Sequence, residues 1–149
     1  MSIQNYTNQY YSYIHEWDSV YEEYAKSVGL SYTSLLILYD IYEVENCTQK
    51  ILCEDCFMPK QTVNAVVTSF YKKGWIRLEE MTQDRRNKTI HLTEKGLNDT
   101  REILENVKEN ENRAMEQLSE SERETLMSLT KKFVTCFKNS MIGENAENE

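Results

Sequence analysis

The chain has 149 residues, of which 40% are hydrophobic and 28% are charged, and its formal net charge at pH 7 is −8. These values fit one ordinary domain with a packed core. No apolar run approaches the roughly 20 residues that a membrane-spanning helix needs, and the first residues lack the regions of a secretory signal. The sequence therefore predicts a cytoplasmic protein without a membrane segment.

The first part of the chain has the spacing of an amphipathic helix. Apolar and aromatic residues recur every three or four positions from Ile3 to Tyr24, and Gly29 follows as a candidate left-handed cap. The face is unusually aromatic for a terminal helix. Two interpretations stay open: the helix covers the core of its own domain, or it forms a dimer interface.

Two further helices are expected before residue 57. The run from Leu35 to Tyr42 is apolar nearly all round, which predicts a buried central helix that continues to about Glu45. A short helix is expected from Thr48 to Cys56, because threonine is a good residue at a helix start.

The next helix is predicted from about Pro59 to Lys73, since proline is favoured at the first helical position. Its apolar positions are expected to face the core: Val63, Val66, Val67, Phe70 and Tyr71. The polar positions are left for solvent or a ligand: Lys60, Gln61, Thr62, Asn64, Thr68 and Lys72.

Two alternating segments, WIRLEEM and KTIHLT, predict a β-hairpin whose turn contains TQDRRN. This hairpin belongs to the only basic part of the chain. Residues 59–95 carry eight basic and four acidic side chains, whereas the segments before and after them are acidic, with net charges of −7 and −5. A polyanion could therefore bind the central segment.

Helical spacing resumes at Glu94 and continues to about Leu118. Ser119 and Glu122 then have the spacing of a capping box. The last helix is expected to present one apolar face, which consists of Leu126, Leu129, Phe133, Phe137 and Met141.

A helix, a short helix, a turn, a polar helix and a basic hairpin, in this order, predict a winged helix-turn-helix. An α-helix fits the major groove of DNA, where amide and hydroxyl side chains can donate to and accept from base edges. The lysines of the polar helix suit phosphates. A hairpin tip can reach an adjacent minor groove, whose negative potential attracts arginine.

The segments TQKILCEDCFMPKQTVNAVVTSFYKKGWI and DRRNKTIHLTEKG resemble the MarR family of winged-helix transcriptional regulators. The resemblance implies a mainly α fold with a small β-hairpin and a homodimer whose terminal helices interlock. By position, Arg86 would enter the minor groove and Asp84 would pair with it, with Arg85 and Lys88 beside them in the wing.

The resemblance also implies a division of the chain. Residues 31–96 would form the DNA-binding lobe, 1–30 and 97–142 the helical dimerisation arms, and 143–149 a flexible tail. The expected function is sequence-specific binding of double-stranded DNA at a pseudo-palindromic operator, with repression of nearby genes. Release by a small aromatic effector or by oxidation is a further expectation, and a pocket near His15, Trp17 and Tyr39 is its candidate site.

The cysteines offer a different chemistry. Cys53 and Cys56 form a C-x-x-C, which could indicate a zinc site or a redox couple. Zinc usually needs four ligands, and neither a second C-x-x-C nor a nearby histidine pair exists, so no metal or cofactor is expected. Thiol sensing stays open, although the two intervening acids are expected to raise the thiol pKa values.

An enzyme is not expected, because the sequence has no Ser/His/Asp arrangement and no glycine-rich phosphate loop. The remaining alternative is a winged-helix module that binds another protein and does not bind specific DNA.

Overall fold

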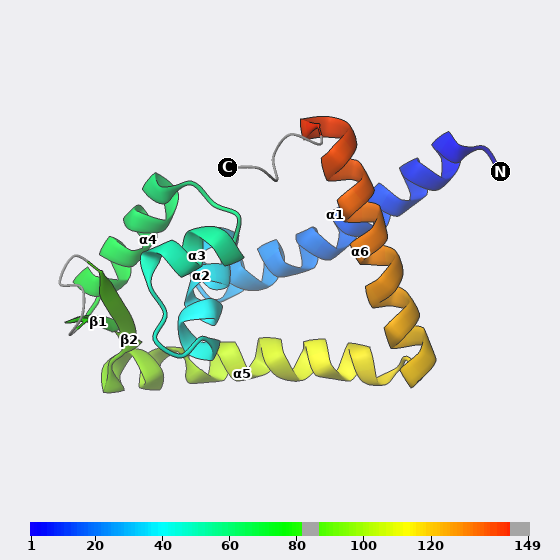
Figure 1. Cartoon of the computed structure of the whole chain (residues 1–149). Helices are drawn as coiled ribbons and strands as arrows, with labels where there is room; N and C mark the ends of the chain where they lie inside the picture. Colours follow the sequence, from blue (N-terminus) through cyan, green and yellow to red (C-terminus); the bar gives the residue numbers. More distant parts are fainter. Residues whose placement is uncertain (82–86, 144–149) are drawn as a thin grey trace. The chain divides into compact units, whose positions relative to one another are not determined.

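A computed structural model describes residues 1–81 and 87–143 of the chain (Figure 1). The chain divides into two compact units, Met1–Leu104 and Glu105–Glu149. The elements of the first unit follow the predicted order, and they are α1 (Ile3–Ser27), α2 (Tyr32–Glu43), α3 (Gln49–Asp55), α4 (Lys60–Lys72), β1 (Ile76–Glu80) and β2 (Lys88–Leu92). Helix α5 (Glu94–Glu116) begins in the first unit and ends in the second, which also contains α6 (Glu120–Ile142).

The helix starts follow from side chains that the sequence supplies. The hydroxyl groups of Ser2, Ser31 and Thr48 each accept a hydrogen bond from the backbone N–H three residues further on. At α6 the side chains of Ser119 and Glu122 form the predicted capping box. Each such cap stabilises its helix by about 1 kcal/mol.

Helix α2 forms the centre of the first unit, as its apolar sequence predicts. Leu35, Ile37, Leu38 and Ile41 are buried, and the helix contacts α1, α3, α4 and β2. The core is completed by side chains from the surrounding elements: Leu52, Val63, Val67, Phe70, Ile76 and Ile90. The helix ends at Glu43, two residues before the predicted end.

The two strands pair in antiparallel fashion, with Ile76 opposite Leu92 and Glu80 opposite Lys88. The segment before α3 pairs with β2: Thr48 forms an isolated bridge with Thr89, and the N–H of Ile90 donates to the Cys47 carbonyl at 2.7 Å. This pairing anchors the hairpin to the start of α3 and was not predicted from the sequence.

Two predictions for α4 are wrong. Pro59 is the N-cap residue and not the first helical residue. Tyr71, which was expected in the core, is 57% exposed. The buried residues Val63, Val67 and Phe70 follow a strict helical stripe, and Tyr71 lies one position further round the helix, beyond its edge.

The terminal helices keep much of their apolar surface exposed. In α6 the predicted face of Leu126, Leu129, Phe133, Phe137 and Met141 is present, but none of its side chains is buried. In α1 only Ala25 is buried, whereas Tyr6, Tyr13 and Trp17 are each more than half exposed. Surfaces this apolar usually serve an interface. None of the helices in residues 1–81 and 87–143 combines the length and the apolarity of a membrane span.

The turn between α3 and α4 contains a strained residue. Phe57 has φ of 51°, and its side chain is 93% exposed. A left-handed conformation costs a residue with a Cβ about 1–2 kcal/mol, but asparagine tolerates it better. We therefore expect Phe57→Asn to stabilise the chain by about 1 kcal/mol in urea unfolding. Phe57→Leu keeps the strain and should bring no gain, and equal stability of the two variants would contradict this reading.

Candidate nucleic-acid interface

Helix α4 presents a polar face on the side opposite its buried stripe. Lys60, Gln61, Asn64, Thr68 and Lys72 are exposed, and Thr62 is half-buried. The face exists because Val63, Val67 and Phe70 fix the rotation of the helix against the core. Five of the six side chains of α4 predicted to meet DNA are thus exposed, and Thr62 is partly covered.

The first turn of α4 is also suited to an anion. Its N-cap residue, Pro59, makes no side-chain hydrogen bond to the first turn. The N–H groups of that turn and the positive end of the helix dipole therefore favour a negatively charged group. Lys60, the first helical residue, adds a cation at the same end.

The hairpin of β1 and β2 forms the wing. Beyond the last strand pair, the N–H of Met81 donates to the Asn87 carbonyl at 3.3 Å, which continues the pairing toward the tip. Lys88 is exposed at the start of β2. Asp84, Arg85 and Arg86 lie outside the residues that the structure describes, so their roles at the wing tip stay predictions.

A compact junction holds the wing against the end of α4. The Thr93 hydroxyl donates to the Gly74 carbonyl at 2.6 Å and accepts from the N–H of Gly96 at 2.9 Å, so it caps α5 and ties it to the chain that leaves α4. The indole N–H of Trp75 donates to Asp99 at 2.9 Å. Asp99 also pairs with Lys95, and both partners lower the pKa of the Asp99 carboxyl, the lysine more strongly.

Gly96 allows the close approach at this junction. A Cβ on residue 96 would lie 2.0 Å from the Trp75 carbonyl oxygen. The sequence TEKG thus has a structural meaning: a cap at Thr93, a lysine that pairs with Asp99, and a glycine against the backbone. Sequence reasoning used these residues only as a family motif, and the Trp75–Asp99 contact gave no signal in the sequence.

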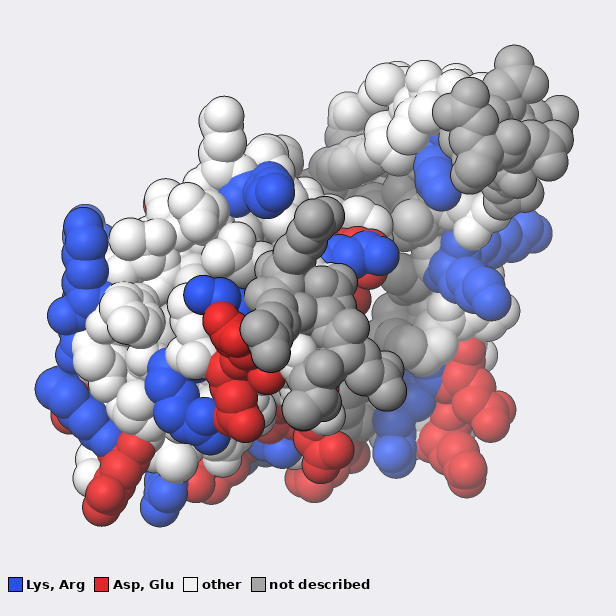
Figure 2. Space-filling view, turned by 60° about the vertical axis from the view of Figure 1, so that its left-hand side comes forward, with Lys and Arg blue, Asp and Glu red and all other residues white. Residues whose placement is uncertain are grey.

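Charged side chains of both signs lie at the surface. On the face that Figure 2 turns toward the viewer, Lys and Arg side chains lie among uncharged residues, and Asp and Glu side chains lie near several of them. On the wing, Glu79 pairs with Arg77 at 2.5 Å and lies 3.8 Å from His91. The carboxylate of Glu79 is thus partly neutralised by Arg77, which lowers the pKa of Glu79.

The two cysteines predicted as a redox couple have different surroundings. The thiol of Cys56 donates to Asp40 Oδ2 at 3.0 Å, and burial together with this carboxylate raises its pKa to about 12. Burial also raises the pKa of Cys47 to about 12, with smaller contributions from Asp40 and Asp55. Cys53 is half-buried. Among the described residues, no cluster of three His, Cys, Asp or Glu side chains could hold a metal ion.

The raised pKa of Cys56 can be tested directly. At pH 8 a thiol with a pKa of about 12 is thiolate in only about one molecule in 10⁴, so its alkylation should be slow and should keep rising with pH. Asp40→Asn removes the carboxylate charge beside Cys56 and should lower the pKa of the Cys56 thiol. Iodoacetamide labelling of Cys56 should then become about tenfold faster for each pKa unit by which the thiol pKa falls. Asp55→Asn is the matched control, because Asp55 contributes less. Identical labelling of Cys56 in all three proteins would contradict the role of Asp40.

The residues suggested for an effector pocket lie on two helices. His15 and Trp17 are exposed on α1, where Trp17 packs near Tyr21, and Tyr39 is half-buried on α2. A pocket of about 460 Å³ lies elsewhere, between the α2–α3 loop and β2, with Tyr42, Arg77 and His91 among its lining residues. The effector pocket stays a prediction.

A helix-turn-helix followed by a two-stranded wing defines the class of this protein as a winged helix-turn-helix. Residues 30–88 match the model of the MarR family. The chain is 32% identical over 87 residues to the HTH-type transcriptional regulator SarZ of Staphylococcus epidermidis, which is 58% of each chain. It is 32% identical over 78 residues to SarZ of Staphylococcus haemolyticus. The match thus spans less than two thirds of these curated relatives.

Solved structures agree with this match over most of the chain. The structure of a MarR family regulator from Neisseria meningitidis matches with a TM-score of 0.78 and 25% sequence identity. This match covers 93% of this chain and 96% of the other. The Staphylococcus aureus MepR–DNA complex is 21% identical, with a TM-score of 0.68 over 89% of this chain and 97% of the other. The second likeness concerns the fold alone. In sequence, residues 30–88 of this chain are thus similar to the MarR family, and its fold is similar to that of solved MarR family regulators.

Proposed function

We propose that the protein is a sequence-specific, DNA-binding transcriptional repressor and not an enzyme. The observation that carries the proposal is the exposed polar face of α4 beside a wing, within the only net-positive segment of the chain. The matched relatives are named as transcriptional regulators, and one solved neighbour is a complex with DNA. This is support by likeness, and it agrees with the chemistry of the surface.

In this proposal each part of the surface has a distinct task. Gln61, Thr62, Asn64 and Thr68 read base edges in the major groove, whereas Lys60 and Lys72 contact phosphates. Asp84 orients Arg86 in the adjacent minor groove, and Arg85 and Lys88 add positive potential. Asparagine and glutamine can pair with adenine through two hydrogen bonds, which makes Asn64 and Gln61 the main candidates for specificity.

We also propose that the functional form is a homodimer. The exposed apolar faces of α1 and α6 support this, since residues such as Trp17, Phe133 and Phe137 are each about 40–60% exposed in the single chain. A two-fold dimer would read a pseudo-palindrome with half-sites about 34–36 Å apart. The acidic arms would then lie away from the duplex. Release by a small aromatic ligand or by oxidation of a cysteine is part of the same proposal.

The proposal is tested by a genome-wide DNA-binding selection with the purified full-length protein. We expect enrichment of a pseudo-palindromic site, upstream of the regulated genes. Recovery of sequences without any common motif would favour the alternative, a winged-helix module that binds another protein. The localisation in the cytoplasm, where the DNA of a bacterial regulator is found, follows from the same proposal.

Asn64→Ala is expected to relax sequence choice at one position of each half-site. The loss of one bidentate base contact should reduce discrimination by about 1–3 kcal/mol, while binding to random DNA changes little. The measurement is competition between the selected duplex and single-base variants. Ser69→Ala, also exposed on α4 but outside the predicted contact set, is the control. An unchanged base preference in Asn64→Ala would remove this residue from the reading surface.

A further inference from the structure

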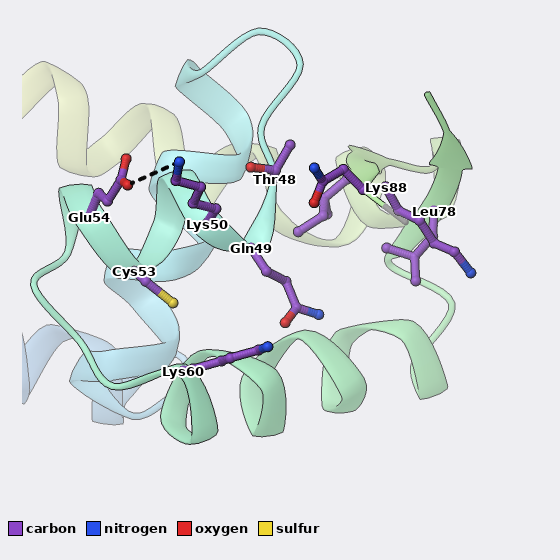
Figure 3. A pocket seen from close by; sticks show the side chains of 10 residues that line it. Thr48, Gln49, Lys50, Cys53, Glu54, Lys60, Leu78 and Lys88 are labelled. Carbon is purple, nitrogen blue, oxygen red and sulfur yellow. Dashed lines mark ion pairs between the residues drawn. The ribbon is translucent and has the colours of Figure 1, made fainter. Parts of the chain in front are cut away.

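A hollow of about 580 Å³ lies between the start of α3, the first residue of α4 and one face of the wing (Figure 3). Gln49 and Cys53 line it from α3, Lys60 from α4, and Leu78, Lys88 and Ile90 from the wing. Neither the predicted DNA-binding residues nor the proposed reading surface includes Gln49 or Leu78, and Cys53 was predicted only as a redox candidate. The three elements that form the hollow all belong to the first unit.

The hollow lies between the two elements that are proposed to enter neighbouring grooves of DNA. If α4 occupies the major groove and the wing extends to the adjacent minor groove, one sugar–phosphate backbone separates the two. That backbone has to cross the surface between α4 and the wing. The hollow lies in this interval, with Lys60 on the α4 side and Lys88 on the wing side.

The lining has two chemical characters. Figure 3 shows the side chains of Gln49 and Lys60 pointing toward one another, which places an amide and an ammonium group together at one side. Cys53, Leu78 and Ile90 contribute apolar surface. Glu54 also lines the hollow, and its carboxylate lies 3.8 Å from the Lys50 ammonium, so these two charges partly neutralise each other. The remaining positive charges of the lining are those of Lys60 and Lys88, and Thr48, Gln49 and Asn87 add uncharged polar groups.

A DNA backbone offers the complementary surfaces. Its phosphate accepts hydrogen bonds from amide and ammonium groups, and its deoxyribose can lie against apolar side chains. Inorganic phosphate would use the donors but would leave the apolar lining uncovered. The combination of donors and apolar surface thus favours a phosphodiester within a nucleic acid over a free anion.

We propose that this hollow binds one phosphodiester of the DNA backbone between the two grooves through Gln49 and Lys60, with Lys88 adding positive charge on the wing side. The inference rests on the proposed function, because it requires α4 and the wing to bind duplex DNA. It adds Gln49 of α3 to the binding surface. It also gives the lobe a fixed contact from which α4 and the wing take their register on the duplex.

The test measures binding of a random-sequence duplex by fluorescence anisotropy at several salt concentrations, since a phosphate contact is independent of sequence. Gln49→Ala should weaken binding about tenfold without changing the salt slope, because glutamine is neutral. Gln49→Glu should weaken it further. Lys88→Ala should reduce the slope of log K against log salt by about 1. Gln117→Glu makes the same charge change in the second unit and should bind as the parent does.

A second arm uses the selected operator with single methylphosphonates, each of which neutralises one phosphate. A methylphosphonate at one position of each half-site should strongly weaken binding by the parent protein. The same substitution should weaken binding by Gln49→Ala much less, which would show that this phosphate interacts with Gln49. Thermal melting of each variant is the check that it is folded.

Three other results would contradict the proposal that the hollow binds a phosphodiester of DNA. If the parent binds duplex DNA but the Gln49 variants bind equally well and no phosphate is coupled to them, this inference fails and the proposed function stands. If inorganic phosphate at constant ionic strength displaces DNA from the parent but not from Gln49→Glu, the hollow holds a free anion. If the parent binds no duplex at all, the proposed function fails, and this inference with it.

Discussion

Gly96→Ala is expected to destabilise the winged-helix lobe by about 3 kcal/mol, at the upper end of the usual cost of overpacking. The added Cβ would lie 2.0 Å from the Trp75 carbonyl oxygen, which is a backbone atom and cannot rotate away. Relief requires a shift of the first turn of α5 away from the chain that enters β1. The hydrogen bond from the Gly96 N–H to Thr93 would be disturbed by the same shift.

Whether Gly96→Ala lowers or raises the free energy of unfolding distinguishes a packing effect from an effect of helix propensity. Alanine in a helix is normally better than glycine by about 1 kcal/mol, so propensity alone would make the variant more stable. Urea unfolding of the full chain gives the free energy, and Asn98→Ala, at an exposed position of the same helix, is the matched control. Gly96→Ser should be as unstable as Gly96→Ala. A Gly96→Ala protein as stable as the parent would show that the junction tolerates a Cβ.

Arg86→Ala is expected to weaken binding of the selected operator by about 10- to 100-fold, as one lost arginine contact in a narrow groove implies. The wing frame that carries this residue is set by the pairing of β1 with β2 and by the bridge between Thr48 and Thr89. Thermal stability and dimerisation should be nearly unchanged, because the predicted role of Arg86 is toward DNA.

The control removes a positive charge elsewhere. Arg101 is exposed on α5. Apart from the general effect of the lost positive charge, Arg101→Ala should bind the operator within about twofold of the parent affinity. Asp84→Ala should weaken binding less than Arg86→Ala, since it removes only the residue predicted to orient the arginine. Operator affinity of Arg86→Ala equal to that of the parent would remove the wing from the interface.

Local sequence signals predicted the helices well. Thr48 and Ser119 cap helices in the structure as predicted, because their hydroxyl groups accept from N–H groups three residues further on, and such contacts are visible in a short stretch of sequence. The polar face of α4 was predictable for the same reason, since helical periodicity assigns a side to each residue.

Contacts between distant segments could not be predicted in the same way. The bridge from Thr48 to Thr89 joins positions 41 residues apart, and neither residue type identifies its partner. Tyr71 belongs to the apolar set that the sequence predicts in the core, whereas the buried stripe of α4 ends one position before it. The hollow lined by Gln49 and Leu78 exists only after α3, α4 and the wing have packed together.

The thiol chemistry shows a similar limit. The sequence predicted raised thiol pKa values from the two acids inside the C-x-x-C. In the structure the carboxylate that contacts Cys56 is Asp40 of α2, which lies 16 positions away. The direction of the pKa shift was therefore as predicted for Cys56, but its main electrostatic cause is a tertiary contact. The redox prediction for Cys53 and Cys56 itself stays untested.

The central claim is that the surface formed by α4 and the wing reads specific DNA. It is tested most directly by measuring the affinity of the purified protein for its selected duplex and for a scrambled duplex of the same length, across a range of salt concentrations. We expect a preference of at least about 10³ for the selected duplex and a steep fall in both affinities as salt increases. Equal affinity for the two duplexes at every salt concentration would contradict it.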